Sequence, residues 1–204
     1  MSGDVHVRCC ERPGVRFPRA TRLVILIDGY RRWQWLERAV WKRLLEELAE
    51  LKVELNRDKT RRVDLAKGGS FSFLGFDMRR CKTRRGKWGV RYVPRMKART
   101  KLLRRLKEVF RRHRSQPVEK VIDRINPILR GWVNYFRIGY ASRCFSYVRD
   151  WVEKKIRRHL MRQRGRRGFG WKRWSRQWLY DGLGLYSQYR VERLPEALPA
   201  GKAP

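Results

Sequence analysis

The segment 124–147 constrains the fold of this chain most, because its apolar residues repeat with the period of a helix. The repeat consists of Ile125, Ile128, Leu129, Trp132, Tyr135 and Phe136. Arginines fall between these positions, and a turn at Gly139 leads to a second helical pattern from Arg143. We therefore expect two helices packed on a core, with guanidinium groups outward on a surface suited to a polyanion.

The charge of the chain points to the same kind of partner. Its 204 residues include 53 Lys and Arg against 19 Asp and Glu, which gives a formal net charge of +34. Such an excess of positive charge repels itself in a compact state, so the folded chain is expected to need an anionic partner. Nucleic acid is the first candidate and an anionic membrane surface the second. A disordered basic tail is disfavoured by the 42% hydrophobic content and the 9 Trp.

Several classes of protein are disfavoured by what the chain contains. The longest apolar run, 23–27, is far shorter than the ~20 residues of a membrane helix, and the first residues do not resemble a secretory signal. The cysteines at positions 9, 10, 81 and 144 form no C-x-x-C pair, and the chain has 3 His. We expect no membrane partner, no metal site and no cofactor, and we expect a reducing cytoplasm as the location.

The pattern of residues 1–94 predicts strands and one helix. Residues 1–22 show no sustained period and are expected to be irregular, and 32–51 is expected to be a helix with Leu36, Val40 and Leu44 on one face. Strands are expected at 23–28, 62–66, 70–78 and 88–94, the third with a bulge near Gly75 and the fourth after a turn at 84–87.

The second half is helical and strongly basic. Helices are expected at 97–114, 118–138 and 143–162, with a short tryptophan-rich helix at 171–179. From Arg95 to Tyr180 there are 27 Lys and Arg against 5 Asp and Glu, a net charge of +22. The expected class is α+β, with a small fragment of antiparallel strands plus one helix before a mainly α-helical basic domain. The expected parts are an N-terminus at 1–22, the fragment at 23–94, the basic domain at 95–190 and a loose tail at 191–204.

Two segments of the helical half carry a family resemblance. INPILRGWVNYFR at 125–137 and SRCFSYVRDWV at 142–152 resemble the maturase-specific domain (domain X, or thumb) of group II intron-encoded reverse transcriptases. Further segments in the family's order resemble late motifs of the palm: LVILIDG at 23–29, ELNRDKT at 54–60 and SFSFLGF at 70–76. The resemblance implies a primer-grip turn at Leu74, Gly75 and Phe76, and a nucleotide-closing lysine at Lys59.

Two departures from the family bear on activity. The alignment of LVILIDG places Thr21 and Arg22 where the family has its two catalytic aspartates, and 13–22 contains no acid. Polymerases hold two divalent cations between carboxylates, and an arginine repels cations. The fingers and the first palm aspartate also lack a counterpart. We therefore expect no catalytic residue, magnesium only in an intact reverse transcriptase, and a reading frame truncated or frameshifted at its N-terminus.

The resemblance and the charge together imply an RNA-binding module that assists folding and splicing of group II intron RNA, without polymerase activity of its own. The charge also permits non-specific DNA binding. Two alternatives remain open: a polymerase half that needs separately encoded fingers and palm, and a non-functional remnant. The candidate RNA-binding residues are Lys97, Arg99, Lys101, Arg104, Arg105, Arg130, Arg137, Arg143, Lys154, Lys155, Arg157, Arg158, Arg166, Arg167, Lys172 and Arg173.

The aromatic residues of the helical half divide into two groups. Those that share the helical stripes are expected in the core: Trp132, Tyr135, Phe136, Trp151 and Trp178. Trp171 and Trp174 lie in an arginine-rich segment that is expected to be exposed, where they either stack on bases or serve the fold.

Overall fold

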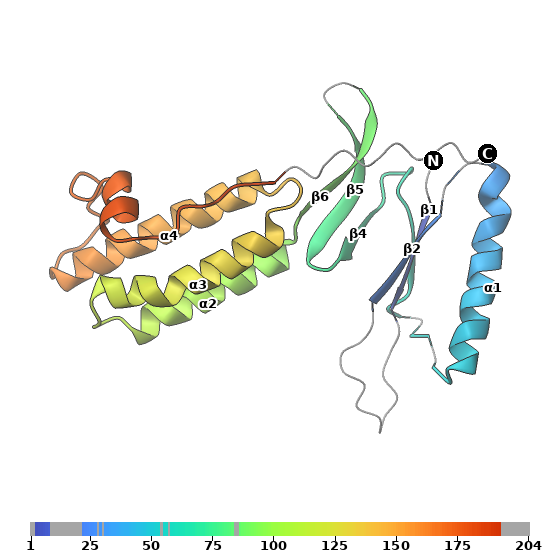
Figure 1. Ribbon diagram of the computed structural model, residues 1–204, viewed down its shortest axis with the longest axis horizontal. Coiled ribbons are helices and arrows are strands. Elements are labelled where there is room, and N and C mark those ends of the chain that lie inside the picture. The colour runs from blue at the N-terminus through green and yellow to red at the C-terminus, as the bar shows by residue number, and fades with distance from the viewer. Residues whose placement is uncertain are drawn as a thin grey trace. The chain divides into compact units, whose positions relative to one another are not determined.

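The chain divides into two compact units, Met1–Tyr92 and Val93–Pro204. The computed structural model describes residues 3–8, 22–27, 29, 31–53, 55–56, 58–83 and 86–192 (Figure 1). The first unit contains strands and one long helix, whereas the second is helical, so the expected α+β class is confirmed. The assignment of the first unit to a palm fragment stays a prediction.

A three-stranded antiparallel sheet opens the first unit, with the order β2-β1-β3. Its strands are β1 (Gly3–Arg8), β2 (Arg22–Ile27) and β3 (Arg61–Asp64). β1 is the central strand: Gly3 pairs with Ile27 on one side and with Asp64 on the other. The expectation of irregular structure is therefore wrong for residues 3–8, because pairing with two distant strands stabilises a segment that is too short to show a period by itself. Residues 9–21 lie outside the described part of the chain.

Helix α1 (Gln34–Glu50) follows a 3-10 turn, Arg31–Trp33, and supplies the apolar partner of the first sheet. Leu36, Val40 and Leu44 pack against Ile27 of β2, as the four-residue spacing predicts. The helix ends at Glu50, and Leu51, the residue after it, is exposed.

A second sheet has the order β4-β5-β6, with β4 (Ser70–Phe73), β5 (Phe76–Lys82) and β6 (Trp88–Pro94). The single bulged strand expected at 70–78 is wrong, since Phe73 pairs with Phe76 across a two-residue turn. Leu74 and Gly75 both have positive φ, 45° and 82°, as the tightest hairpin turns require. Leucine is uncommon at the first of these positions, so the sequence gives a weak turn signal.

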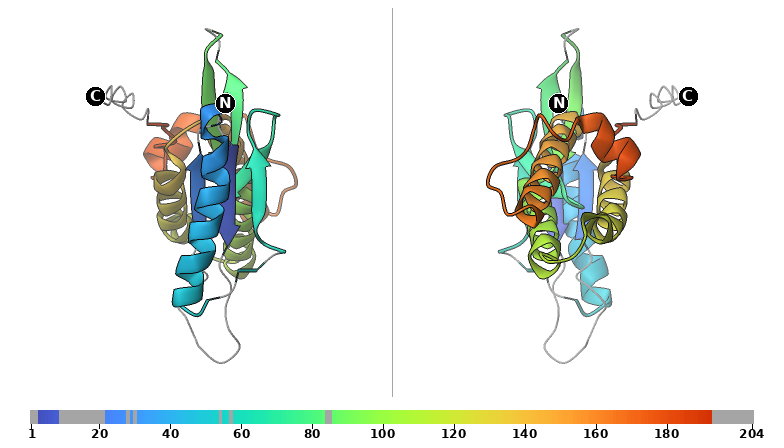
Figure 2. Two further views of the ribbon diagram at one scale, coloured as in Figure 1. Left: turned by 90° about the vertical axis from the view of Figure 1, so that its right-hand side faces the viewer. Right: turned by 90° about the vertical axis from the view of Figure 1, so that its left-hand side faces the viewer.

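The second unit is built on three helices that pack together: α2 (Met96–Arg112), α3 (Val118–Phe136) and α4 (Ser142–Gln163) (Figure 2). The apolar stripes expected from the sequence meet in one core. Its fully buried side chains include Leu106, Ile125, Leu129, Phe145 and Ile156. Each contributes about 1.5–3 kcal/mol to folding through burial, so this core is the main source of stability for the unit.

Beyond α4 the chain turns back and runs along the helices (Figure 1). We call residues 164–192 the return segment. The amide of Asn126 in α3 holds this return segment at two points: Nδ2 donates to the Gly184 carbonyl over 2.8 Å, and Oδ1 accepts the Tyr186 N–H over 2.9 Å. Further along, Glu192 N–H donates to the Arg137 carbonyl over 2.8 Å. The part of the expected tail from 193 onward lies outside the described residues.

The limits predicted for the helix at 171–179 are wrong. Turns occupy 171–174, and a π-helical turn follows at Trp178–Gly182. The Ser175 hydroxyl accepts the Trp178 N–H over 3.1 Å, which is how a serine caps the start of a helical segment. The helical backbone therefore begins only after Ser175. Within the residues described, no helix has the length and apolar character needed to cross a membrane.

Candidate nucleic-acid interface

The outward face of α2 is a row of cations. Lys97, Lys101, Arg104 and Arg105 are exposed, whereas Leu102 faces the core. Exposed cations continue along the helix with Lys107, Arg111 and Arg112, which the sequence reasoning did not single out although they fit the same helical spacing. Together these residues form a surface on which several phosphates could bind.

A groove of about 530 Å³ lies between α2 and α3, and it brings some of these cations beside aromatic rings. Lys101 and Arg105 line its α2 side, and Trp132 and Tyr135 line its α3 side. Tyr135 is 53% exposed, so its expected place in the core is wrong: the buried stripe passes through Val133 and leaves Tyr135 at the margin. Arg130 is exposed on the same helix.

Two candidate arginines make local contacts that hold their side chains. The Arg99 guanidinium lies 4.2 Å from the ring centroid of Tyr147. Burial raises the pKa of the Cys144 thiol, and the charge of Arg99 offsets part of that rise. Arg137 pairs with Glu192 over 2.9 Å. Arg143, at the start of α4, is exposed. These arginines surround the turn between α3 and α4.

The exposed side of α4 crowds several cations together. Lys154 and Arg158 are exposed, while Lys155 is half-buried with its ammonium 5.2 Å from the Trp151 ring centroid. Burial lowers the pKa of Lys155, and repulsion from Arg158 and Lys107 lowers it further. A bound phosphate would relieve that repulsion, which is the electrostatic condition for anion binding.

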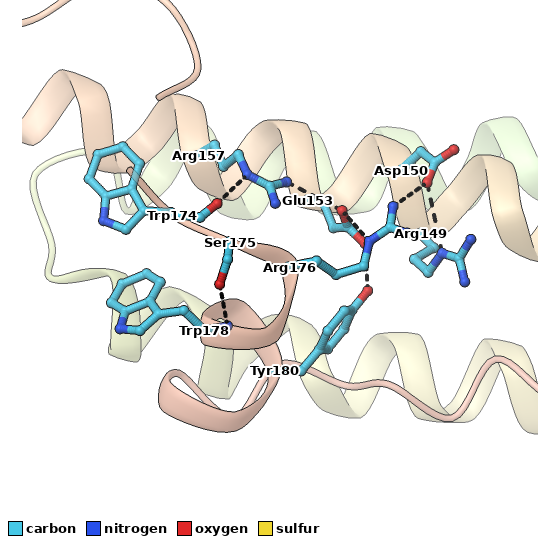
Figure 3. A network of polar contacts seen from close by, with 9 residues as sticks. All are labelled: Arg149, Asp150, Glu153, Arg157, Trp174, Ser175, Arg176, Trp178 and Tyr180. Carbon is cyan, nitrogen blue, oxygen red and sulfur yellow. Dashed lines mark hydrogen bonds and ion pairs between the residues drawn. The ribbon is translucent and has the colours of Figure 1, made fainter. Parts of the chain in front are cut away.

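Arg157 does not belong to this surface. It is 3% exposed, its Nε donates to the Trp174 carbonyl over 3.1 Å, and it pairs with the Glu153 carboxylate over 3.3 Å. Figure 3 shows that Glu153 is the centre of this network. Arg157 therefore stabilises the fold and is not accessible to RNA.

Glu153, which is 2% exposed, has two further partners from the return segment. Arg176 Nε lies 2.9 Å and 3.1 Å from the two carboxylate oxygens, and the Tyr180 hydroxyl donates to one of them over 2.7 Å. Hydrogen bonding to Glu153 raises the pKa of Arg176. Arg176 also reaches Asp150 over 3.2 Å. The sequence signal for this network was an isolated glutamate four residues before Arg157 in a basic helix.

The loop after α4 carries the last candidate cations. Arg166, Arg167, Lys172 and Arg173 are all exposed. Trp178 is 39% exposed, so its expected place in the core is wrong. Trp174 is buried at 7% exposure and serves the fold, which is one of the two roles left open for it. Trp174 can fold inward because Gly170 has no side chain: a Cβ there would lie 2.4 Å from the Trp174 ring.

The remaining candidates belong to the first unit. Leu74 is exposed at the tip of the β4–β5 hairpin, next to Gly75 and Phe76. Lys59 lies in a turn closed by its N–H bond to the Asn56 side chain over 3.0 Å. Thr21 lies outside the described residues and Arg22 begins β2. The primer-grip, nucleotide-closing and catalytic assignments stay predictions.

Part of the second unit matches a known protein family. Residues 99–178 match the family model of the group II intron, maturase-specific domain. The match spans most of α2, all of α3 and α4, and the loop up to the π-helical turn. A search of the curated proteins finds no match. The expected resemblance of the helical half is confirmed and supports a maturase-type role, whereas the palm motifs lie outside the matched residues.

The Glu153 network predicts a large difference between two acidic residues of one helix. Glu153→Gln leaves the buried Arg157 without its counter-ion and should lower the free energy of unfolding by about 3–5 kcal/mol. Asp150→Asn removes a half-exposed partner of the same Arg176 and should cost less than about 1 kcal/mol. Denaturant unfolding of the full chain measures both. Equal losses in the two variants would contradict the central place of Glu153.

Tyr180 predicts how stability depends on alkaline pH. Burial, and then its bond to Glu153, raise the pKa of Tyr180 well above its ordinary value of 10.0. The folded state thus keeps a proton that the unfolded chain loses, so the stabilisation is complete below pH 10 and declines as the pH rises further. Tyr180→Phe should make this decline shallower, measured by denaturant unfolding between pH 9 and 11. Tyr140→Phe, at an exposed site, is the control, and an unchanged decline in Tyr180→Phe would refute the prediction.

Proposed function

We propose that this protein is an RNA-binding module of the maturase type, which assists group II intron RNA in reaching the folded form that splices. The observation that carries the proposal is the match of residues 99–178 to the maturase-specific domain. It is supported by the exposed cations of α2, α4 and the following loop, most of which belong to the matched segment.

The physical chemistry of this unit suits structured RNA. Its cations would contact phosphates and release counterions, which gives strong binding at low salt and a steep loss of affinity as salt increases. Shape selectivity needs a surface whose groups keep their relative positions, because folded RNA is recognised through the spacing of its backbone and 2′-hydroxyls. The packed core of Leu106, Ile125 and Phe145 provides such a frame.

We further propose that the chain does not polymerise DNA by itself. The aligned catalytic positions are Thr21 and Arg22, and neither side chain can bind a divalent cation as a carboxylate does. Extension of a primed RNA template by the purified chain with magnesium would overturn this part of the proposal. A polymerase half completed by another chain remains the alternative in the enzyme class.

Binding to RNA across a salt series tests the main proposal. The full chain should prefer a group II intron RNA over a length-matched unrelated structured RNA and a DNA duplex, and the preference should persist near 200 mM salt, where phosphate contacts alone lose orders of magnitude. Equal binding to all three ligands that disappears with salt would instead indicate a non-specific polycation.

A matched pair of variants locates the surface that binds RNA. Lys101→Ala with Arg105→Ala removes two exposed cations of α2 inside the matched segment. This change should reduce the slope of log affinity against log salt by roughly 0.7–0.9 for each phosphate that no longer meets a cation. Arg38→Ala with Lys42→Ala removes the same charge from α1 and should leave the slope nearly unchanged. Equal effects of the two double variants would show that only net charge matters.

A further inference from the structure

The loop between α4 and the π-helical turn presents two aromatic rings among its cations. Phe169 and Trp171, which we call the aromatic shelf, have ring centroids 5.9 Å apart with planes tilted by 41°. Phe169 is half-buried, whereas Trp171 is 52% exposed. The Trp171 ring therefore offers a large aromatic face to a ligand.

A cation whose position is fixed by the fold lies against the Trp171 ring. The Arg157 guanidinium lies 4.5 Å from the centroid of the Trp171 ring. Arg157 is itself immobilised by Glu153 and by the Trp174 carbonyl, at 3.3 Å and 3.1 Å. The Arg158 guanidinium lies 5.7 Å from the Phe169 ring centroid in the same way. Rings seated on cations in this way are ordered before any ligand arrives, so a ligand that stacks on them loses little conformational entropy.

The backbone conformation of the loop around Phe169 is also restricted. Gly168 and Gly170, on either side of Phe169, have φ of 99° and 62°, where side chains are strained. The Gly170 carbonyl accepts the N–H groups of Arg173 and Trp174, both over 3.1 Å. The buried Trp174 ring occupies the space that a Cβ on Gly170 would need. These contacts fix where the aromatic shelf points relative to α4.

The positive charge around the aromatic shelf favours an anionic ligand. Eleven Lys and Arg and no Asp or Glu occur from Lys154 to Tyr180. The exposed members nearest the shelf in sequence are Arg166, Arg167, Lys172 and Arg173. An aromatic face combined with several phosphate-binding cations is the arrangement by which proteins hold single-stranded nucleic acid, with bases stacked on rings and the backbone on cations.

We propose that the aromatic shelf is a stacking site for an unpaired base of the bound RNA, with Trp171 as the platform and the neighbouring arginines and lysines on the flanking phosphates. The inference rests on the proposed RNA-binding function and assigns a ligand to one part of that surface. Bases inside a duplex are already stacked and do not offer their faces, so the site distinguishes unpaired nucleotides from helical RNA.

Two RNA ligands test this assignment: a blunt hairpin whose two strands are joined by a non-nucleotide linker, so that it has no unpaired base, and the same hairpin with a short unpaired extension. In the full chain, Trp171→Leu keeps an apolar side chain over Arg157 but removes the stacking face. It should weaken binding of the extended hairpin by about 5- to 150-fold, the range for one base stacked on an aromatic side chain. It should change binding of the blunt hairpin less than about twofold, because the phosphate contacts persist. Trp171→Phe should recover most of the affinity.

Trp35→Leu is the matched control, because Trp35 is a similarly exposed tryptophan on α1, outside the matched segment. Unchanged binding of the extended hairpin by Trp171→Leu, or equal weakening of both hairpins, would overturn the proposal. So would a Trp171-dependent gain in binding to anionic lipid vesicles with no effect on RNA. Preference of the unaltered protein for intron RNA is measured separately, so failure of the shelf and failure of the maturase role give different results.

Discussion

The attachment of the C-terminal part to α4 depends on one buried carboxylate. Glu153 is the only acidic residue between Asp150 and Asp181, and it lies on the core side of a helix that is otherwise crowded with cations. A charged group removed from water is stable only when its partners satisfy it. Arg157, Arg176 and Tyr180 do so from α4 and from the return segment. Glu153 is therefore the side chain through which ion pairs and hydrogen bonds tie the C-terminal part to α4, as Asn126 ties it to α3.

The position of the basic loop follows from that interaction. Because Arg176 and Tyr180 are tied to Glu153, the chain between α4 and the π-helical turn must close over Arg157. Arg157 is thereby withdrawn from the surface and supports Trp171 instead. Asn126 holds the following residues on α3. A protein with a large positive charge thus displays its cations and its aromatic shelf on a frame that resists their mutual repulsion.

The sequence predicted those elements whose signal is local. The helices α2, α3 and α4 each carry an apolar stripe, and β2 is a continuous apolar run, so their existence could be read from spacing. The strand β1 could not, because its stability comes from two distant partners. The site followed the same division. The outward cations of α2 were predictable from helical spacing. Arg157 lies in a basic helix and therefore looks like a surface residue in the sequence. Its burial depends on Glu153, whose other partners lie 23 and 27 residues further along the chain.

Amide hydrogen exchange of the full chain tests most directly whether the return segment and α4 form one unit. The informative amides are Leu185, which donates to the Leu179 carbonyl, and Tyr186, which donates to the Asn126 side chain. We predict that they open together with the amides around Ile156 in α4, at the same free energy, because Glu153 joins the two segments. Rapid exchange at Leu185 and Tyr186 while α4 stays protected would show that the segment is only loosely attached and that Glu153 does not join it to α4.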